Sequence, residues 1–531
     1  MKKKYYFLLF FYLPFLSFSQ AIKFQLDIGN ANWQTNGIAW QTSDGGYIVN
    51  GSTNYNQPSG DIFLMKTDSA GNKLWLKTYG DTNEDDAFYC IPTLDNGYLL
   101  SGWLSSISGN VFIKTDLNGN TLWVKSNTSG QGSIKYIFQS SPGAYFLVYS
   151  GGALSKIDNA GNMLWTKYYD MWGGISSGRV TPDGGLILCG NKWINSDSAN
   201  ATLIKTDSAG NPQWEKIFGI VNANNESGND VCATGDGGYA LLGSTNWLAN
   251  GPTGGQAMVI KTDSVGNMQW AKTYGGTFTT GPYQIEAVSG GAIGYVYTLA
   301  TFGETENNPP PQHSGRCSLL NIDINGNYVW GEMYGGMAAN QYNSNDLAFN
   351  LSRTKDGGFL LSGESQSFCS QSGDPGDIWI VKTDPNGISG CNELLTAITV
   401  ITPTLTITSS PGWDTTRIFP LTNTTITIGT WQAKDSVLCP TSNSAVNELT
   451  QLEAQVNIYP NPSQGKFAIT SDRFKIENVE VYNVMGEKIY SKQSSHEQET
   501  QINISSESQG IYFVRVNTSM GIVSKKVLLV R

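Results

Sequence analysis

The chain has 531 residues; only 14% are charged, 11% are aromatic, and glycine occupies 60 positions. This composition favours turn-rich β structure over helices or disorder, and the length predicts two or more folded units. The formal charge of −10 and the pI near 4.9 argue against a nucleic-acid binder or a binder of anionic membranes, because both depend on basic patches.

Residues 1–19 carry the features of a secretory signal peptide. Three lysines precede an apolar run of about a dozen residues, and the small residues Ser17 and Ser19 lead to a cleavage point before Gln20. The run is shorter than the roughly 20 apolar residues that span a bilayer, and no later segment reaches that length. We therefore expect an exported protein with no transmembrane segment, in a compartment where disulfides persist.

Two short elements alternate from residue 20 to residue 390. One is the decapeptide KTDSAGNKLW at 66–75, with copies at 114–123, 155–165, 205–214, 261–270 and 321–330 and a truncated copy at 382–387. The other is TSDGGYIVNG, with relatives such as TLDNGYLLSG and TPDGGLILCG. In both elements apolar runs flank an Asp/Asn/Gly turn, which is typical of a β-hairpin. Two hairpins predict a four-stranded repeat unit.

The spacing of the repeat predicts the architecture. The tryptophans at 75, 123, 165, 214, 270 and 330 are 48, 42, 49, 56 and 60 residues apart, a period typical of one propeller blade. The last copy lacks a Trp-bearing fourth strand. Residues 21–47 align on 72–98 with a shift of 51, which puts Phe24 in the place of Trp75. We predict an all-β fold: a seven-bladed β-propeller over 20–390, closed by the N-terminal strand, which leaves no open sheet edge.

The decapeptide itself is predicted to be a structural turn. Asp68 and Asn72, with Gly71 supplying a positive φ, are the residues that a tight hairpin turn requires. Calcium binding is possible but unsupported, because the turns lack the alternating oxygen ligands and the distal Glu of a calcium loop. No cofactor is predicted.

One face of the propeller is predicted to carry the ligand site. Aromatic residues recur shortly after the second strand of several units, and aromatic rims suit flat apolar ligand faces, although repeated aromatics also pack between blades. Three carboxylates are expected at matching places just before innermost strands, on the same face. The candidates are Tyr55, Trp103, Trp193, Trp247, Phe368, Asp86, Asp230 and Asp346.

Binding is favoured over catalysis at this face. The chain has two histidines, His313 in a Pro-rich stretch and His496 near the C-terminus, so the repeats offer no His–acid pair to activate a nucleophile. No catalytic residue and no metal site are predicted. We expect a binding module for a carbohydrate or a protein ligand. The alternatives are a glycoside hydrolase-like enzyme that uses the face carboxylates, and a structural surface component.

Seven cysteines leave at least one unpaired within the chain. Cys90, Cys189 and Cys232 lie in apolar strand-like runs and are expected to be buried thiols. Cys391 and Cys439 bracket a Thr-rich β extension, 391–440, and we predict a disulfide between them. Cys317 and Cys369 are a second candidate pair.

The chain ends in a second module. A polar linker, 441–455, precedes three runs within 456–531 that alternate apolar and polar residues, which predicts a small antiparallel sandwich. These runs contain three motif blocks, formed by Tyr459, Pro460, Asn461, Pro462, Gly465, Gly486, Gly510, Tyr512, Lys525 and Lys526. The blocks closely resemble the C-terminal sorting domain of type IX secretion cargo in Gram-negative bacteria. The resemblance implies a partner, the type IX machinery, and delivery to the outer-membrane surface or release.

Overall fold

The computed structural model describes the chain from residue 22 to residue 530 in two compact units, 21–440 and 441–531, with 1–20 grouped with the second. The stretches outside the description are 1–21, 30–34, 54–59, 129–131, 142, 170, 172–173, 196–197, 221–224, 246–255, 276–278, 288–292, 302–313, 336–345, 369–375, 396–398, 411–413, 418–421, 430–433, 440–455, 472–474, 484–487, 519–520 and 531. The predicted signal peptide and the linker therefore lie outside the described residues.

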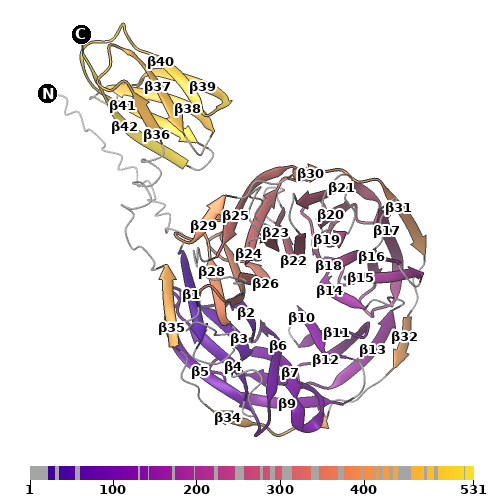
Figure 1. Ribbon diagram of the computed structural model, residues 1–531. Helices are drawn as coiled ribbons and strands as arrows, with labels where there is room; N and C mark the ends of the chain where they lie inside the picture. Colours follow the sequence, from indigo (N-terminus) through magenta and orange to yellow (C-terminus); the bar gives the residue numbers. More distant parts are fainter. Residues whose placement is uncertain are drawn as a thin grey trace, which may run out of the picture. The chain divides into compact units, whose positions relative to one another are not determined.

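The first unit is built from five-stranded antiparallel sheets arranged around a centre (Figure 1). We number them blades 1–7 by the order of their innermost strands. Blade 1 contains β2 (Thr35–Gln41), β3 (Tyr47–Ser52), β4 (Ile62–Thr67) and β5 (Lys73–Gly80). Blade 2 contains β6 (Asp85–Pro92), β7 (Tyr98–Leu104), β8 (Gly109–Thr115) and β9 (Thr121–Asn127). Blade 3 contains β10 (Ile134–Ser141), β11 (Ala144–Tyr149), β12 (Ala153–Asp158) and β13 (Met163–Tyr169). A short 3-10 helix, η1 (Ser105–Ile107), follows β7.

The remaining blades repeat this plan. Blade 4 contains β14 (Ile175–Val180), β15 (Leu186–Asn195), β16 (Ser198–Thr206) and β17 (Pro212–Ile220). Blade 5 contains β18 (Glu226–Ala233), β19 (Tyr239–Thr245), β20 (Gln256–Thr262) and β21 (Met268–Gly275). Blade 6 contains β22 (Thr279–Ala287), β23 (Ile293–Thr301), β24 (Ser314–Ile322) and β25 (Tyr328–Tyr334). Blade 7 combines β26 (Asp346–Arg353), β27 (Phe359–Ser365) and β28 (Asp377–Lys382) with the N-terminal β1 (Phe24–Gly29), which pairs antiparallel with β28. The all-β fold class is confirmed.

A belt of short strands supplies the fifth, outermost strand of every blade (Figure 1). The belt runs through residues 393–439 and passes the blades one at a time, from blade 6 back through blade 1 and then to blade 7. Its strands are β29 (Glu393–Leu395), β30 (Thr399–Ile401), β31 (Leu405–Ser410), β32 (Asp414–Arg417), β33 (Thr422–Asn423), β34 (Thr427–Gly429) and β35 (Lys434–Cys439). The Thr-rich segment predicted as a separate extension is thus integrated into the propeller unit.

The decapeptide turns join neighbouring blades, and their predicted turn chemistry is confirmed. Asp68 accepts hydrogen bonds from the backbone N–H groups of Ala70 and Asn72, and Gly71 has a φ of +87°. The turn glycine also lies against the tryptophan of the preceding blade, so a Cβ at Gly119 would lie only 2.9 Å from the Trp75 ring. Equivalent contacts join Trp123 to Gly161, Trp165 to Gly210, Trp214 to Gly266, Trp270 to Gly326, Trp330 to Gly387 and Phe24 to Gly71.

A buried lysine links the two repeat elements within a blade. The ammonium of Lys261 is 1% exposed and bonds Asp236 of the first hairpin turn at 2.7 Å and the carbonyl oxygen of Thr262 at 2.8 Å. A buried ammonium needs such a partner, because desolvation of an unpaired charge is costly. The pair recurs as Lys66–Asp44, Lys114–Asp95, Lys205–Asp183 and Lys382–Asp356.

The cysteines follow the prediction in part. Cys90, Cys189 and Cys232 are buried and free, as expected. The proposed Cys317–Cys369 pair is wrong, because Cys317 is a free thiol inside the core of blades 6 and 7. Cys391 is disulfide-bonded, and its Sγ lies 3.5 Å from the carbonyl oxygen of Leu438, the neighbour of Cys439 in β35.

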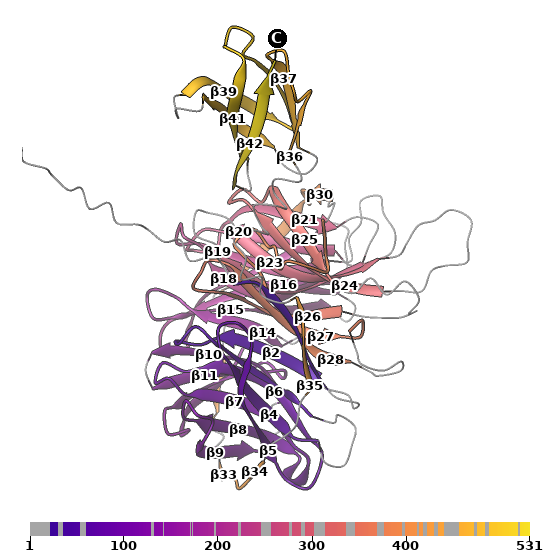
Figure 2. The ribbon, with the colours of Figure 1, turned by 90° about the vertical axis from the view of Figure 1, so that its left-hand side faces the viewer.

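The second unit packs two sheets around an apolar core (Figure 2). The three-stranded sheet has the order β36 (Val456–Tyr459), β37 (Lys466–Ser471), β40 (Glu499–Asn503). The four-stranded sheet has the order β39 (Lys488–Glu497), β38 (Ile476–Asn483), β41 (Gly510–Thr518), β42 (Gly521–Leu529).

Several residues of the sorting motif hold the second unit together. The Asn461 side chain donates to the carbonyl oxygen of Lys526 at 2.8 Å and accepts from the Leu528 N–H at 3.0 Å, which joins the first motif block to the last. The Tyr512 hydroxyl donates to Ser508 O at 2.6 Å. Gly465 has a φ of +97°, and a Cβ there would lie 2.4 Å from Ser505 Cα. Gly486 lies outside the described residues.

Candidate functional site

A β-bulge interrupts the innermost strand of every blade at the same height. In each case the pairing register with the second strand shifts by one residue near the start of the innermost strand. Such a bulge inserts an extra residue and turns its side chain out of the regular ladder. The shifts fall between Thr35 and Ile38, Ala87 and Tyr89, Ile134 and Tyr136, Ile175 and Ser177, Gly228 and Asp230, Pro282 and Gln284, and Ala348 and Asn350.

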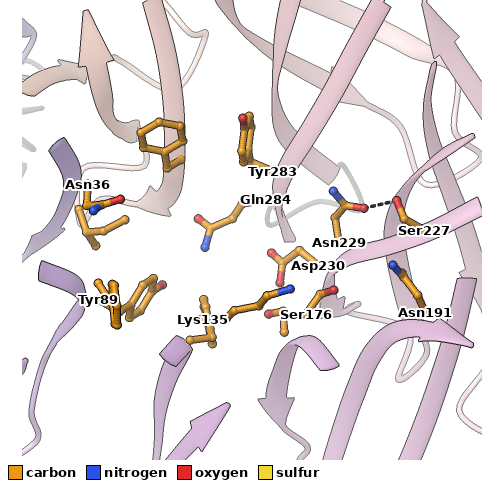
Figure 3. Close-up of a pocket in the computed structure, with 15 residues that line it drawn as sticks. Asn36, Tyr89, Lys135, Ser176, Asn191, Ser227, Asn229, Asp230, Tyr283 and Gln284 are labelled. Atoms are coloured by element: carbon orange, nitrogen blue, oxygen red, sulfur yellow. Dashed lines mark hydrogen bonds between the residues drawn. The ribbon is translucent and has the colours of Figure 1, made fainter. Parts of the chain in front are cut away.

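The bulges line one pocket at the centre of the ring, with a volume of about 470 Å³ (Figure 3). We call the bulge side chains that line it the bulge ring. In six blades the ring residue directly precedes the next paired residue: Phe88, Lys135, Ser176, Asn229, Tyr283 and Phe349. Blade 1 has Gly37 at that position and contributes Asn36, the residue before it. The residues that follow the bulges form the next layer of the wall, namely Ile38, Tyr89, Tyr136, Ser177, Asp230 and Gln284.

The bulge ring has an aromatic arc and a polar arc. The aromatic arc comes from blades 6, 7 and 2 and is interrupted by Asn36 of blade 1. The rings of Tyr283 and Phe349 pack edge to face with centroids 5.4 Å apart. The polar arc comes from blades 3, 4 and 5 and contains Lys135, Ser176 and Asn229. Ser227 donates to the Asn229 amide oxygen at 2.6 Å, which orients that side chain (Figure 3). A ligand in the pocket therefore meets apolar rings on one side and hydrogen-bonding groups on the other.

A chain of contacts links side chains of six blades at the base of the pocket. The Tyr89 hydroxyl of blade 2 donates to Asn350 of blade 7 at 3.4 Å, and the rings of Tyr89 and Tyr136 lie 4.7 Å apart. The Arg179 guanidinium lies 4.7 Å from the Tyr136 ring centroid and pairs with Asp230 at 3.2 Å and with Glu286 at 3.6 Å. We call Asn350, Tyr89, Tyr136, Arg179, Asp230 and Glu286 the floor cluster.

The carboxylates of the floor cluster differ in their surroundings. Asp230 is 1% exposed; its Oδ2 accepts from Arg179 and from the Ile285 N–H at 3.0 Å, whereas its Oδ1 has no hydrogen-bond partner among the described residues. Burial raises the pKa of Glu286 to about 7, although the Arg179 charge opposes the rise. One oxygen of Asp230 is therefore a buried acceptor without a partner among the described residues, on a residue that lines the pocket.

The structure brings one predicted site residue, Asp230, into the pocket. Trp193 is 46% exposed on β15, two residues beyond the pocket residue Asn191 and thus on the same side of the strand. Trp103 is half-buried in β7, and Phe368 packs on the Trp379 ring at 6.0 Å as part of the blade core. Tyr55 and Trp247 lie outside the described residues.

The predicted equivalence of Asp86, Asp230 and Asp346 is wrong. The strand pairing places Asp86 opposite Trp103, Asp230 after the bulge opposite Leu242, and Asp346 at the first position opposite Ser365. Asp346 is buried, and its carboxylate accepts from Ser365, at 2.6 Å, and from Ser367, at 2.7 Å. Burial raises the pKa of Asp86 to about 6. The three carboxylates therefore share neither a height nor a role.

Sequence reasoning missed the bulge ring. On both sides of a bulge, apolar and polar residues alternate along the strand in the usual way. The extra residue disturbs this alternation over only three or four residues, so the disturbance is hard to see in the sequence. The signal in the sequence is a pair of large or polar residues at that point, such as Phe88-Tyr89 or Asn229-Asp230.

The described residues lack two kinds of feature. They contain no group of three or more His, Cys, Asp or Glu side chains placed to hold a metal ion. Within the same residues, no helix has the length and apolar character needed to cross a bilayer.

Comparison with known proteins identifies the second unit. Residues 457–530 match the family model described as the secretion system C-terminal sorting domain. None of the curated protein sequences matches the chain. The solved structures similar to it include Kuenenia stuttgartiensis hydrazine synthase, at 12% identity and a TM-score of 0.29 over 45% of this chain and 77% of that chain.

Two further solved structures are similar to the chain. "YCF48 bound to D1 peptide" has 12% identity and a TM-score of 0.37 over 67% of this chain and all of that chain. "Structure of Dos1 propeller" has 10% identity and a TM-score of 0.38 over 68% of this chain and 95% of that chain.

The sheets and the sorting domain together define the class of protein. The chain is a β-propeller protein that carries a type IX secretion sorting domain at its C-terminal end. It is exported by the type IX route to the cell surface or the extracellular space.

Proposed function

We propose that this exported propeller is a binding module whose ligand occupies the central pocket. The observation that carries the proposal is the bulge at one height in all seven innermost strands, because together the bulges direct side chains from every blade into one cavity. Bulges bend a strand and re-aim side chains, and they are over-represented beside functional sites.

The composition of the pocket favours a carbohydrate ligand. Sugar rings have apolar C–H faces and hydroxyl edges, which match the aromatic arc and the polar arc of the bulge ring respectively. Amides and hydroxyls supply most of the polar lining, through Asn36, Asn191, Asn229, Gln284 and the serines 176, 177 and 227. One lysine and one aspartate line the pocket, so its charge is nearly balanced and a neutral glycan fits best.

Binding is favoured over hydrolysis by the placement of the acids. The hydrolase alternative depended on carboxylates gathered at one face, and Asp86 and Asp346 do not line the pocket. Asp230 does line it, but the Arg179 guanidinium holds one of its oxygens. A glycosidase needs two carboxyl groups facing the scissile bond.

The test is binding of the purified full-length protein to a panel of soluble and insoluble polysaccharides. We expect saturable binding to at least one polymer, and at least about tenfold weaker binding for Tyr283→Ala, because the ring is a half-exposed part of the aromatic arc. The matched control is Leu117→Ala, which removes an exposed apolar side chain from a β8–β9 turn at the opposite end of the strands.

Two results would contradict this function. If no polysaccharide binds, a protein ligand or a structural surface role takes the place of the carbohydrate proposal. If a polymer binds and Tyr283→Ala and Leu117→Ala behave alike while both keep the wild-type melting temperature, the ligand lies outside the pocket.

A further inference from the structure

We infer that the pocket is a blind socket that takes the end of a glycan chain, so that the protein binds polymer termini and not the middle of a strand. This inference rests on the proposed function and specifies which part of the ligand the site recognises. It follows from three features of the pocket: an obstructed floor, a buried acceptor without a partner among the described residues, and a limited volume.

Contacts between side chains of different blades obstruct the floor. Contacts run from Asn350 through Tyr89, Tyr136 and Arg179 to Asp230 and Glu286, which takes in blades 7, 2, 3, 4, 5 and 6. Blade 1 adds Trp40, whose ring lies 6.4 Å from that of Tyr89. The Tyr89–Asn350 and Arg179–Glu286 contacts each skip one blade and so run as chords across the channel.

Several side chains below the pocket are packed, whereas Arg179 and Glu286 of the floor cluster keep 18% and 24% of their side chains exposed. Ile91 and Phe138, two residues beyond Tyr89 and Tyr136 on the same side of their strands, expose only 6% and 7% of their surface. Ser352 in blade 7 exposes 4%, and its hydroxyl is buried without a partner among the described residues. A glycan strand threaded through the ring would have to displace these side chains and break the Arg179–Glu286 contact, so the inference places ligand entry at the bulge ring.

The Oδ1 atom of Asp230 is a buried hydrogen-bond acceptor near the base of the socket. Asp230 lines the pocket and is almost fully buried, and its Oδ1 has no partner in the described part of the chain (Figure 3). A buried acceptor without a partner is costly, and a ligand hydroxyl that reaches it recovers a charge-assisted hydrogen bond. Terminal sugar units carry a hydroxyl where internal units carry a glycosidic bond, so the end of a chain can supply this donor.

The volume limits how much of a chain can enter. The cavity of about 470 Å³ lies in the lower part of the roughly 300–1,000 Å³ range of small-molecule pockets. That space holds one or two sugar rings. Their apolar faces would lie on Phe88, Tyr283 and Phe349, with hydroxyls toward Ser176 and Asn229 on the opposite arc.

The experiment has two parts. The first measures how the affinity of the protein for an oligosaccharide depends on the number of sugar units. The second measures how the amount of protein bound by a polymer depends on the number of polymer ends. The probes are xylo-, cello- and manno-oligosaccharides of one to six units, titrated into the full-length protein by calorimetry. We expect affinity for the bound series to stop rising by the third unit. A fixed mass of the corresponding polymer should bind more protein after limited acid hydrolysis, in proportion to the new ends.

A filled-socket variant separates end-on from side-on binding. Ser176→Trp places an indole in the pocket from a bulge, where side-chain volume is available, and should abolish binding of oligosaccharide and polymer. The same substitution at the exposed Ser43, in the β2–β3 turn at the opposite end of the strands, should change nothing. Melting temperatures of both variants establish that they are folded.

The outcomes distinguish this inference from the function beneath it. End recognition would be overturned if the affinity keeps rising up to six sugar units and if hydrolysis leaves the amount of protein bound per mass of polymer unchanged. Carbohydrate binding itself would then remain in place. Binding that survives in folded Ser176→Trp would also overturn it. No binding by any glycan would remove the proposed function, and the inference with it.

Discussion

At the scale of single residues, the recurring Asp-x-x-Gly-Asn turn has two roles at once. Its Asp and Asn close the hairpin, as in Asp116 and Asn120, where the Asn side chain donates to the Asp carboxylate at 2.8 Å. Its glycine lets the tryptophan of the preceding blade lie against the turn backbone. Tyr79, which lies in the same strand as Trp75, donates its hydroxyl hydrogen to Gly119 O in the next blade at 2.7 Å. The turn therefore fixes both the hairpin and the spacing between blades.

Replacing the turn glycine separates these roles. Gly119→Ala meets both a positive φ of 73° and the Trp75 ring at 2.9 Å, whereas Gly45→Ala meets a φ of 87° and nothing within 4 Å. We expect Gly45→Ala to lower the free energy of unfolding by about 1 kcal/mol and Gly119→Ala by about 2–4 kcal/mol. Urea unfolding measures both, and equal losses would mean that the tryptophan contact adds nothing.

The buried Lys–Asp pairs predict a pH dependence. Partial burial opposes ionisation of Asp236, but hydrogen bonds from Lys261, Thr234 and Gly238 outweigh it and lower its pKa to about 2. Because the pKa falls on folding from an unfolded value of about 3.9, the pair stabilises the fold above pH 4, and this contribution is lost as the pH falls toward 2. Solvent screening limits it to about 1 kcal/mol, since the carboxylate is 34% exposed.

We expect Asp236→Asn to be less stable than wild type at pH 7, and the difference to shrink between pH 4 and pH 2. Urea unfolding at several pH values measures this difference. The double variant Asp236→Asn/Lys261→Met should regain part of the loss, because it also removes the buried ammonium. A difference that stays constant down to pH 2 would assign the effect to packing.

At the scale of elements, the belt protects what would otherwise be seven exposed sheet edges. Each fourth strand pairs with a belt strand, as β17 does with β31 over six residue pairs. Unpaired edges invite association with other chains, so covering them favours a monomeric ring. Both ends of the belt meet at β1: the Gln25 side chain donates to Ser389 Oγ at 2.9 Å and to Cys391 O at 2.6 Å, and Gln25 pairs with Cys439.

This meeting point supports the predicted Cys391–Cys439 bridge, which would close the belt around all seven blades. Non-reducing peptide mapping should recover the two cysteines in one linked pair. Cys439→Ser should lower the free energy of unfolding by about 4 kcal/mol, the chain-entropy value for a loop of this length. A reducing agent should lower the free energy of unfolding of the wild-type protein to that of the Cys439→Ser variant and leave the value of the variant unchanged. A link from Cys391 to Cys369 would refute the bridge.

At the scale of the whole molecule, the N-terminal strand completes the ring. β1 lies between β28 and β35, so it pairs on both edges, and Phe24, Leu26 and Ile28 are buried. Deleting residues 22–29 removes both pairings and exposes the edges of β28 and β35. We expect the melting temperature to fall sharply, by roughly 10 °C or more, since roughly 2–4 °C is lost per kcal/mol in large domains. An unchanged melt would contradict closure by β1, and a variant lacking 456–531 is the control, because that segment belongs to the other compact unit.

The sequence by itself determined what depends on short-range chemistry. The hairpin turns, the repeat that builds the blades and the sorting domain can each be recognised from residues only a few positions apart, such as Asp68 and Asn72 or Asn461 and Pro462. The resemblance of the last 76 residues to type IX cargo likewise needed only local motifs.

Only the tertiary structure decided the site and the path of the belt. The pocket depends on one extra residue in each of seven strands, and a bulge becomes visible only when the partner strand shows the shift in register. For this reason Asp86, Asp230 and Asp346 looked equivalent in sequence but lie at different positions in their strands. The belt strands are two to six residues long and carry little pattern of their own, because the edges they cover supply most of their hydrogen bonds.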